Sequence, residues 1–132
     1  LLNTASAAGL LMALGDAPYS VTKHAAVAFA EYLAVTYAAK GIRVSCLCPQ
    51  WVRTPMLTGA IDSVEGASGN AAFQRIGGII EPEDVAGVVV EALAEERFLV
   101  LPHPEVGKYM SRRGDDHERW LNGMRKLALQ WG

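Results

Sequence analysis

The chain has 132 residues, a length typical of one domain, and 51% of them are hydrophobic, which supplies ample material for a core. Its net charge of −2 and the lack of a basic stripe argue against nucleic acid as a partner. The sequence shows no apolar run of membrane-spanning length and no signal-peptide pattern, so we expect no membrane partner and a cytoplasmic location.

The first part of the chain is predicted to pass from a strand through a loop into a long helix. Residues 1–5 have the pattern of a strand end, and residues 7–17 mix small and turn-forming residues with a few apolar ones. A helix is expected over residues 18–40, because a proline stands at its first position and Gly41 is a natural stop. Its apolar face, at helical spacing, would cover a sheet; that face contains Val21, Ala25, Ala28, Tyr32, Val35 and Ala39, widened by Phe29 and Leu33.

A buried strand is expected over residues 42–48, which are rich in apolar and β-branched side chains, and Pro49 ends it. Cys46 and Cys48 lie two apart, so they point to the same face of this strand and cannot easily bond to each other. Buried, reduced thiols fit a cytosolic protein better than a Cys-x-Cys metal site, because no second ligand pair accompanies them. We therefore expect no metal.

The second half of the chain is expected to hold a long connection, a helix, a short strand and a helical tail. Residues 55–80 mix glycines and polar residues with apolar ones, which is typical of a lid or binding loop, although a surface loop is the alternative. A helix should begin at Pro82, and residues 97–101 should form the last strand.

The tail of the chain is expected to form a helix. Asp115 and Glu118 have capping-box spacing before an apolar stripe, which predicts a helix packed on its own or a neighbouring subunit. A membrane-surface or partner-docking helix is the alternative.

Three residues have the chemistry of a proton-transfer site. Tyr19 and Lys23 lie four residues apart near the start of the predicted helix, so their side chains share one face. A nearby ammonium and a helix N-terminus both favour a phenolate, which makes a tyrosine a usable acid/base. Ser6, thirteen residues before Tyr19, could hold a substrate oxygen by a hydrogen bond. Chance is the alternative, because this spacing is common on helices.

Taken together and in order, several segments resemble the short-chain dehydrogenase/reductase family. The family pattern is a serine, a tyrosine thirteen residues later, a lysine four further on, and then a strand followed by a Pro-Gly-aromatic-Val-x-Thr loop. The matching segments are NTASAAG at 3–9, YSVTK at 19–23, IRVSCLCP at 42–49 and WVRTP at 51–55. The resemblance covers roughly residues 1–101.

The resemblance implies an α/β fold, namely the C-terminal half of a doubly wound parallel-sheet (Rossmann-like) domain. It implies an NAD(P)-dependent oxidoreductase, with NAD or NADP as cofactor, that interconverts a secondary alcohol and a carbonyl. Ser6 would orient the substrate carbonyl, Tyr19 would be the general acid/base, and Lys23 would favour its phenolate and hold the nicotinamide ribose. With Tyr19 and Lys23, the residues implied to contact the cofactor are Pro49, Trp51, Val52 and Thr54.

The family also implies partners for this chain. Its members pack the long helix against the same helix of a second subunit, so a homodimer or homotetramer is implied. The family places its substrate loop at residues 55–80, where apolar residues would favour an apolar small-molecule alcohol or carbonyl. These residues belong to the oxidoreductase segment 1–101, which a helical extension, 102–132, follows.

The sequence departs from the family pattern in three ways. Gln50 stands where the family usually has glycine, which narrows the approach to the nicotinamide or demands different backbone angles. The Gly-rich phosphate loop and the family's catalytic asparagine have no counterpart here. The chain is therefore interpreted as a C-terminal half, and the competing hypothesis is a truncated, non-catalytic fragment that oligomerises but does not bind cofactor.

Overall fold

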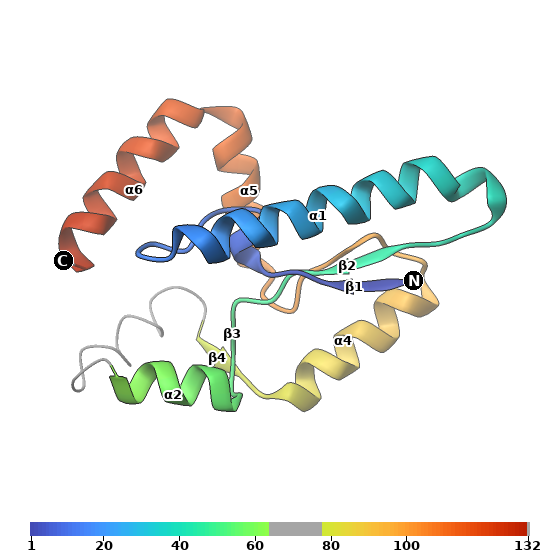
Figure 1. Cartoon of the computed structure of the whole chain (residues 1–132), viewed down its shortest axis with the longest axis horizontal. Helices are drawn as coiled ribbons and strands as arrows, with labels where there is room; N and C mark the ends of the chain where they lie inside the picture. Colours follow the sequence, from blue (N-terminus) through green and yellow to red (C-terminus); the bar gives the residue numbers. More distant parts are fainter. Residues whose placement is uncertain (64–77, 132) are drawn as a thin grey trace.

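The computed structural model describes residues 1–63 and 78–131 and folds them into parallel strands flanked by helices (Figure 1). Two short 3₁₀ turns, η1 and η2, precede and follow the longest helix. In chain order the elements are β1 (Leu2–Thr4), η1 (Ala7–Gly9), α1 (Ala17–Tyr37), η2 (Ala38–Lys40), β2 (Ser45–Leu47), β3 (Trp51–Val52), α2 (Pro55–Ser63), β4 (Ile79–Ile80), α4 (Pro82–Ala94), β5 (Leu99–Val100), α5 (Glu105–Asp115) and α6 (His117–Trp131).

The main sheet confirms the expected α/β class. Its strands run parallel in the order β1-β2-β5, with Asn3 paired to Cys46 and Cys46 paired to Leu99. Helices α1 and α4 lie on opposite faces of this sheet, which is the doubly wound arrangement (Figure 1). Among the described residues, β1 pairs only with β2, so one side of β1 is an unpaired sheet edge.

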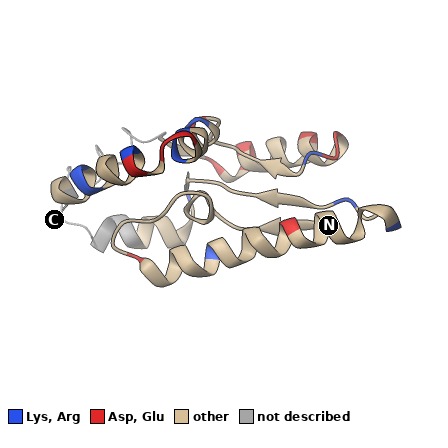
Figure 2. Cartoon of the chain, turned by 90° about the horizontal axis from the view of Figure 1, so that it is seen from above, with Lys and Arg blue, Asp and Glu red and all other residues tan. Residues whose placement is uncertain are grey.

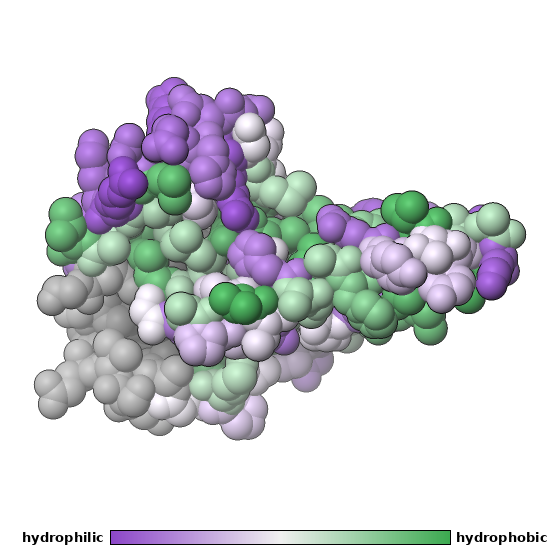
Figure 3. Space-filling model, turned by 45° about the horizontal axis from the view of Figure 1, so that its top comes forward, coloured by the Kyte–Doolittle hydropathy of each residue, from purple (hydrophilic) through white to green (hydrophobic). Residues whose placement is uncertain are grey.

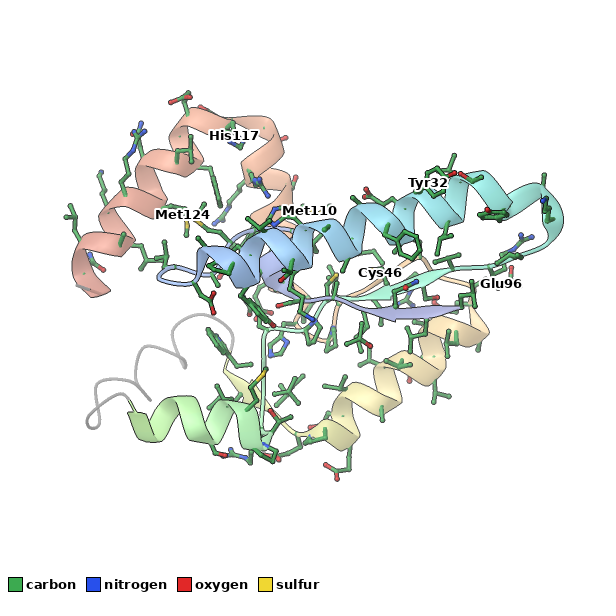
Figure 4. The ribbon with its side chains drawn as sticks, in the orientation of Figure 1. Tyr32, Cys46, Glu96, Met110, His117 and Met124 are labelled. Atoms are coloured by element: carbon green, nitrogen blue, oxygen red, sulfur yellow. The ribbon has the colours of Figure 1, made fainter. Side chains whose placement is uncertain are left out.

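The core has two layers because side chains alternate along β2. Cys46 faces α1, where it packs with Val27 and Ala30 between the helix and the sheet (Figure 4). Leu47 faces the other way, toward Ala92 of α4. Cys46 and Cys48 are both fully buried free thiols with 3.8 Å between their sulfur atoms, as the two-residue spacing predicted.

Helix α1 begins and ends close to the predicted positions, but it turns a different face to the sheet. Asp16 caps it by accepting a hydrogen bond from the backbone of Tyr19 at 2.9 Å, and Gly41 takes the left-handed conformation after η2. The interpretation that the predicted apolar face covers the sheet is wrong. Of that face Leu33 is packed against the core, whereas the other members are exposed; Phe29 is 57%, Tyr32 59% and Val35 80% exposed.

The exposed side of α1 carries few charges (Figure 2). Between its ends, Lys23 and Glu31 are its charged residues. Hydrophobic residues are visible along the arm that α1 forms at the right of Figure 3, whereas α5 and α6 are largely hydrophilic on their outer surface. An apolar, weakly charged helix face in contact with solvent is typical of an interaction surface.

The predicted connection over 55–80 contains structure that periodicity did not reveal. Its first part is helix α2, and its end is β4, which pairs in parallel with β3 to form a separate two-stranded sheet. The remaining residues, 64–77, lie outside the described part of the chain, so the lid remains a prediction. No described helix has both the length and the apolar character needed to cross a membrane.

The tail forms a pair of helices where a single helix was expected. Helix α5 was not predicted, and α6 begins one residue later than the capping box indicated. The side chain of Asp116 accepts a hydrogen bond from the backbone of Arg119 at 2.9 Å, so Asp116 is the cap and Asp115 is the last residue of α5.

Candidate active site

Ser6 is held at the end of β1 by its own loop. It is buried, and its hydroxyl oxygen accepts a hydrogen bond from the backbone of Ala8 at 3.1 Å, which caps η1. The hydroxyl also donates to the carbonyl of Pro49 across a long 3.5 Å, while the backbone of Ala7 donates to the same carbonyl at 2.8 Å. These bonds tie Ser6 to the segment that follows β2.

Tyr19 and Lys23 occupy the first two turns of α1, on the same side of the helix. Both side chains are half-buried, and the Lys23 ammonium lies 5.6 Å from the centre of the Tyr19 ring. An ammonium at this distance from an aromatic ring is attracted to it, which holds the charge close to the phenol. The helical spacing of four residues therefore brings the two groups together as predicted.

All seven predicted site residues line one cavity of about 1330 Å³. It lies beyond the carboxyl ends of β1 and β2, where open α/β sheets bind their ligands. The segment between β2 and α2 contributes to its lining, and so do Ser6, Tyr19 and Lys23. The predicted residues on this lining are Ser6, Tyr19, Lys23, Pro49, Trp51, Val52 and Thr54.

Gln50, at the family's glycine position, fits without backbone strain. It keeps a negative φ and lines the same cavity, so its side chain narrows the site without requiring the left-handed conformation. Its backbone N–H donates to Nδ1 of His103 at 3.1 Å. His103 is therefore a buried support for the segment between β2 and β3, and no local sequence pattern indicated this contact.

A further wall of the cavity comes from the C-terminal helix pair. Tyr109 and Arg112 of α5 and Trp120 and Met124 of α6 line it, and Met124 lies on the side of α6 that faces the start of α1 (Figure 4). The apolar stripe of the tail predicted that one side of α6 would pack against other residues. It did not predict that this side lines the cavity. The charged residues on the lining are of both signs: Lys23, Arg112 and Arg119 against Asp16, Asp115 and Asp116.

The buried thiols and the metal-ligating residue types do not add a second site. The hydrogen bond that the Cys48 thiol donates to the Cys46 sulfur raises the pKa of Cys48, and burial raises it further, so that thiol stays protonated. Within residues 1–63 and 78–131, no three histidine, cysteine or acidic side chains are grouped closely enough to hold a metal ion.

Comparison with known proteins identifies the family. Residues 1–100 match the family model described as enoyl-(acyl carrier protein) reductase, which covers most of the chain. A 1-deoxy-11-beta-hydroxypentalenate dehydrogenase of Streptomyces exfoliatus is 35% identical over 116 residues, covering 88% of this chain and 39% of that protein. A 2,5-dichloro-2,5-cyclohexadiene-1,4-diol dehydrogenase of Sphingobium indicum is 38% identical over 101 residues, covering 76% of this chain and 40% of that protein.

Solved structures support the same assignment. A short-chain dehydrogenase/reductase of Burkholderia phymatum, in complex with NAD, matches with a TM-score of 0.67 and 31% identity, over 89% of this chain and 47% of that one. An actinorhodin polyketide ketoreductase with NADPH matches with a TM-score of 0.65 and 30% identity, over 80% of this chain and 46% of that one. The chain belongs to the short-chain dehydrogenase/reductase family, and it spans less than half the length of these relatives.

Proposed function

We propose that this chain forms the catalytic half of an NAD(P)-dependent oxidoreductase that interconverts a secondary alcohol and a carbonyl. Residues 1–101 would form that half, and residues 102–132 a helical extension that closes the substrate side. The observation that carries the proposal is the common cavity of the acid/base, its ammonium neighbour, the serine and the segment after β2. Both the dehydrogenase relatives and the NAD- or NADPH-bound structures described above agree with it.

The cavity fits the nicotinamide end of such a cofactor. Pro49, Trp51 and Val52 contribute apolar lining, and Thr54 adds a hydroxyl. Lys23, on the same lining, has three donors for a ribose. When bound, the nicotinamide supplies or accepts the hydride, and the residues of this chain handle the proton.

Proton transfer is assigned to three side chains. In alcohol oxidation, Tyr19 as a phenolate takes the hydroxyl proton, and in carbonyl reduction its phenol returns a proton. Lys23 places a positive charge 5.6 Å from the centre of the Tyr19 ring. Ser6 can hold the substrate oxygen, because its bond to the Pro49 carbonyl is long and its hydroxyl can rotate toward a better acceptor.

The substrate we propose is an apolar small molecule. Met12 and Leu14 on the loop after η1, Met56 on α2, and Trp120 and Met124 on α6 give the substrate side of the cavity a largely apolar lining. Apolar pockets with few polar groups bind ligands through burial and use the polar groups for orientation. Two relatives are named for small-molecule alcohols, a hydroxypentalenate and a cyclohexadienediol.

A second proposal concerns assembly: the exposed apolar face of α1 is the contact of a homodimer or homotetramer. It rests on the exposure of Phe29, Tyr32 and Val35 and on the small number of charged residues between the ends of α1. Burying such a face against its copy would remove several large apolar side chains from water, each with a gain of about 1.5–3 kcal/mol when fully buried.

Two measurements test the function. Titration with NADH or NADPH, followed by nicotinamide fluorescence, should saturate; no binding would instead favour the non-catalytic fragment. Tyr19→Phe should lower turnover by about 10² to 10⁴ while leaving cofactor binding intact, because it removes only the acid/base hydroxyl. Tyr37→Phe is the matched control, since Lys40 lies 5.3 Å from that ring at the other end of α1, away from the cavity lining. Unchanged turnover in Tyr19→Phe would contradict the assigned mechanism.

A further inference from the structure

Arg113, in the last turn of α5, connects three segments that are distant in the sequence. Its guanidinium donates closely to the carbonyl of Leu10 and, at 3.4 Å, to that of Leu11, both just beyond η1. The same nitrogen lies 3.3 Å from Nε2 of His24 on α1. Arg113 therefore contacts both the loop that follows Ser6 and the helix that carries Tyr19.

The orientation of His24 explains how it accepts this cation. Its Nδ1 lies 2.8 Å from the carbonyl of Ser20, and a carbonyl can only accept, so Nδ1 carries the hydrogen. In the neutral ring, Nε2 then has a free lone pair, and that lone pair faces Arg113. None of the ion pairs found among the described residues includes Arg113, so uncharged acceptors, rather than a carboxylate, fix its position.

Arg113 also holds the aromatic wall of the cavity. Its guanidinium carbon lies 5.0 Å from the centre of the Trp120 ring, within cation–π range, and the ring of His117 lies 5.7 Å from the same indole. Trp120 is half-buried and lines the same cavity as the serine and the tyrosine. The guanidinium thus anchors the indole on one side and the Ser6 loop on the other.

We propose that Arg113 is a positioning residue: it locks the α5–α6 pair onto the loop after Ser6 and so fixes Trp120 as the wall that selects bulky apolar substrates. This inference rests on the proposed oxidoreductase function, because it assigns the substrate side of that site. Because the contacts join residues about a hundred positions apart, the lock exists only in the folded chain. The KM and kcat of a short substrate that does not reach Trp120 should not depend on Arg113.

The kinetic test uses the full-length protein and two secondary alcohols of different bulk, 2-propanol and a decalol. Arg113→Met should raise KM for the decalol roughly tenfold, the size expected for losing hydrogen bonds from a charged donor, and leave kcat and KM for 2-propanol within about twofold. Arg113→Lys should fall in between, because an ammonium keeps the charge but lacks the planar fork. Arg125→Met is the matched control, since Arg125 lies on α6 off the cavity lining and bonds to Asn122 at 2.7 Å.

A second readout does not depend on activity. Backbone amides of residues 117–131 should exchange hydrogen faster in Arg113→Met and in His24→Phe, but not in Arg125→Met. Trp120→Leu should weaken decalol binding while leaving the exchange of α5 unchanged, because it removes the wall and keeps the Leu10 contact. Equal effects on both alcohols, or unchanged exchange in Arg113→Met, would overturn the proposal. If neither alcohol is oxidised by the unaltered protein, the proposed function is contradicted. The hydrogen-exchange data still test whether Arg113 holds the α5–α6 pair in place.

Discussion

Gly9 packs directly against the backbone of Lys23. A Cβ atom at position 9 would lie 2.5 Å from the carbonyl oxygen of Lys23 and 2.8 Å from its carbonyl carbon. These are contacts that neither a rotamer change nor a flexible side chain can relieve. Because η1 begins after Ser6, this close approach sets how near the serine comes to the helix that carries Tyr19 and Lys23.

The first prediction is that Gly9→Ala destabilises the protein and lowers its activity. The added methyl must push η1 away from α1, and overpacking of this kind costs about 1–3 kcal/mol. Urea unfolding should show a lower midpoint, with kcat reduced because Ser6 moves away from Tyr19. Gly87→Ala on α4 is the control: no atom lies within 4 Å of its added Cβ, and alanine favours a helix interior by up to about 1 kcal/mol over glycine. Equal midpoints for Gly9→Ala and the unaltered protein would refute the argument.

The second prediction concerns the charge beside Tyr19. Lys23→Met should reduce the rate of alcohol oxidation, because it removes the positive charge that lies 5.6 Å from the centre of the Tyr19 ring. It should also weaken cofactor binding, because the ribose donors are lost. Steady-state kinetics and the cofactor titration measure the two effects. Lys40→Met, beside the Tyr37 ring, should change neither. A rate of oxidation that Lys23→Met leaves unaltered would remove the role assigned to this ammonium.

Local patterns predicted those parts of the fold that local physics determines. The helix stop at Gly41 follows from backbone preference, and the burial of Cys46 in β2 and of Cys48 just after it follows from strand alternation. The orientation of α1 could not be predicted, because alanines and large apolar residues occur nearly all round the helix and its periodicity selects no single face. The paired strands β3 and β4 have two residues each, too few for any alternation to be seen.

The candidate site also has a part that the sequence could predict and a part that it could not. The serine, the tyrosine and the lysine are joined by one short segment whose spacing fixes their relation, so sequence alone could group them. The support from His103 and the lock at Arg113 depend on contacts across 53 and 103 positions, which no local pattern contains. Helix α5 was missed for a related reason: two glycines interrupt it, and of its residues Val106 is the buried one.

The third prediction is a pH dependence of stability from His103. This side chain is 2% exposed, and burial lowers the pKa of its imidazole below the usual value of about 6.5, although the nearby Glu105 opposes the shift. In the unfolded chain the ring takes its proton near pH 6.5, and in the folded chain only at lower pH. Stability should therefore be full above pH 6.5 and fall as the pH drops from there toward the folded pKa.

The variant His103→Asn should flatten this dependence. Its amide oxygen can still accept the N–H of Gln50, which His103 accepts at 3.1 Å, but it does not titrate. Urea midpoints measured between pH 5 and 8 give the comparison. If the variant loses stability with acid as steeply as the unaltered protein, another group is responsible.

The fourth prediction is that the exposed face of α1 joins two subunits. Val35 is 80% exposed, with the large side chains of Phe29 and Tyr32 beside it on the same face, so a carboxylate there would have to be buried without a partner in the assembly. Val35→Glu should therefore shift the mass measured by light scattering from an oligomer to a monomer. Val90→Glu is the matched control, because Val90 is 67% exposed on α4, on the opposite side of the sheet. A monomeric mass for the unaltered protein, or an oligomer that survives Val35→Glu and not Val90→Glu, would move the contact away from α1.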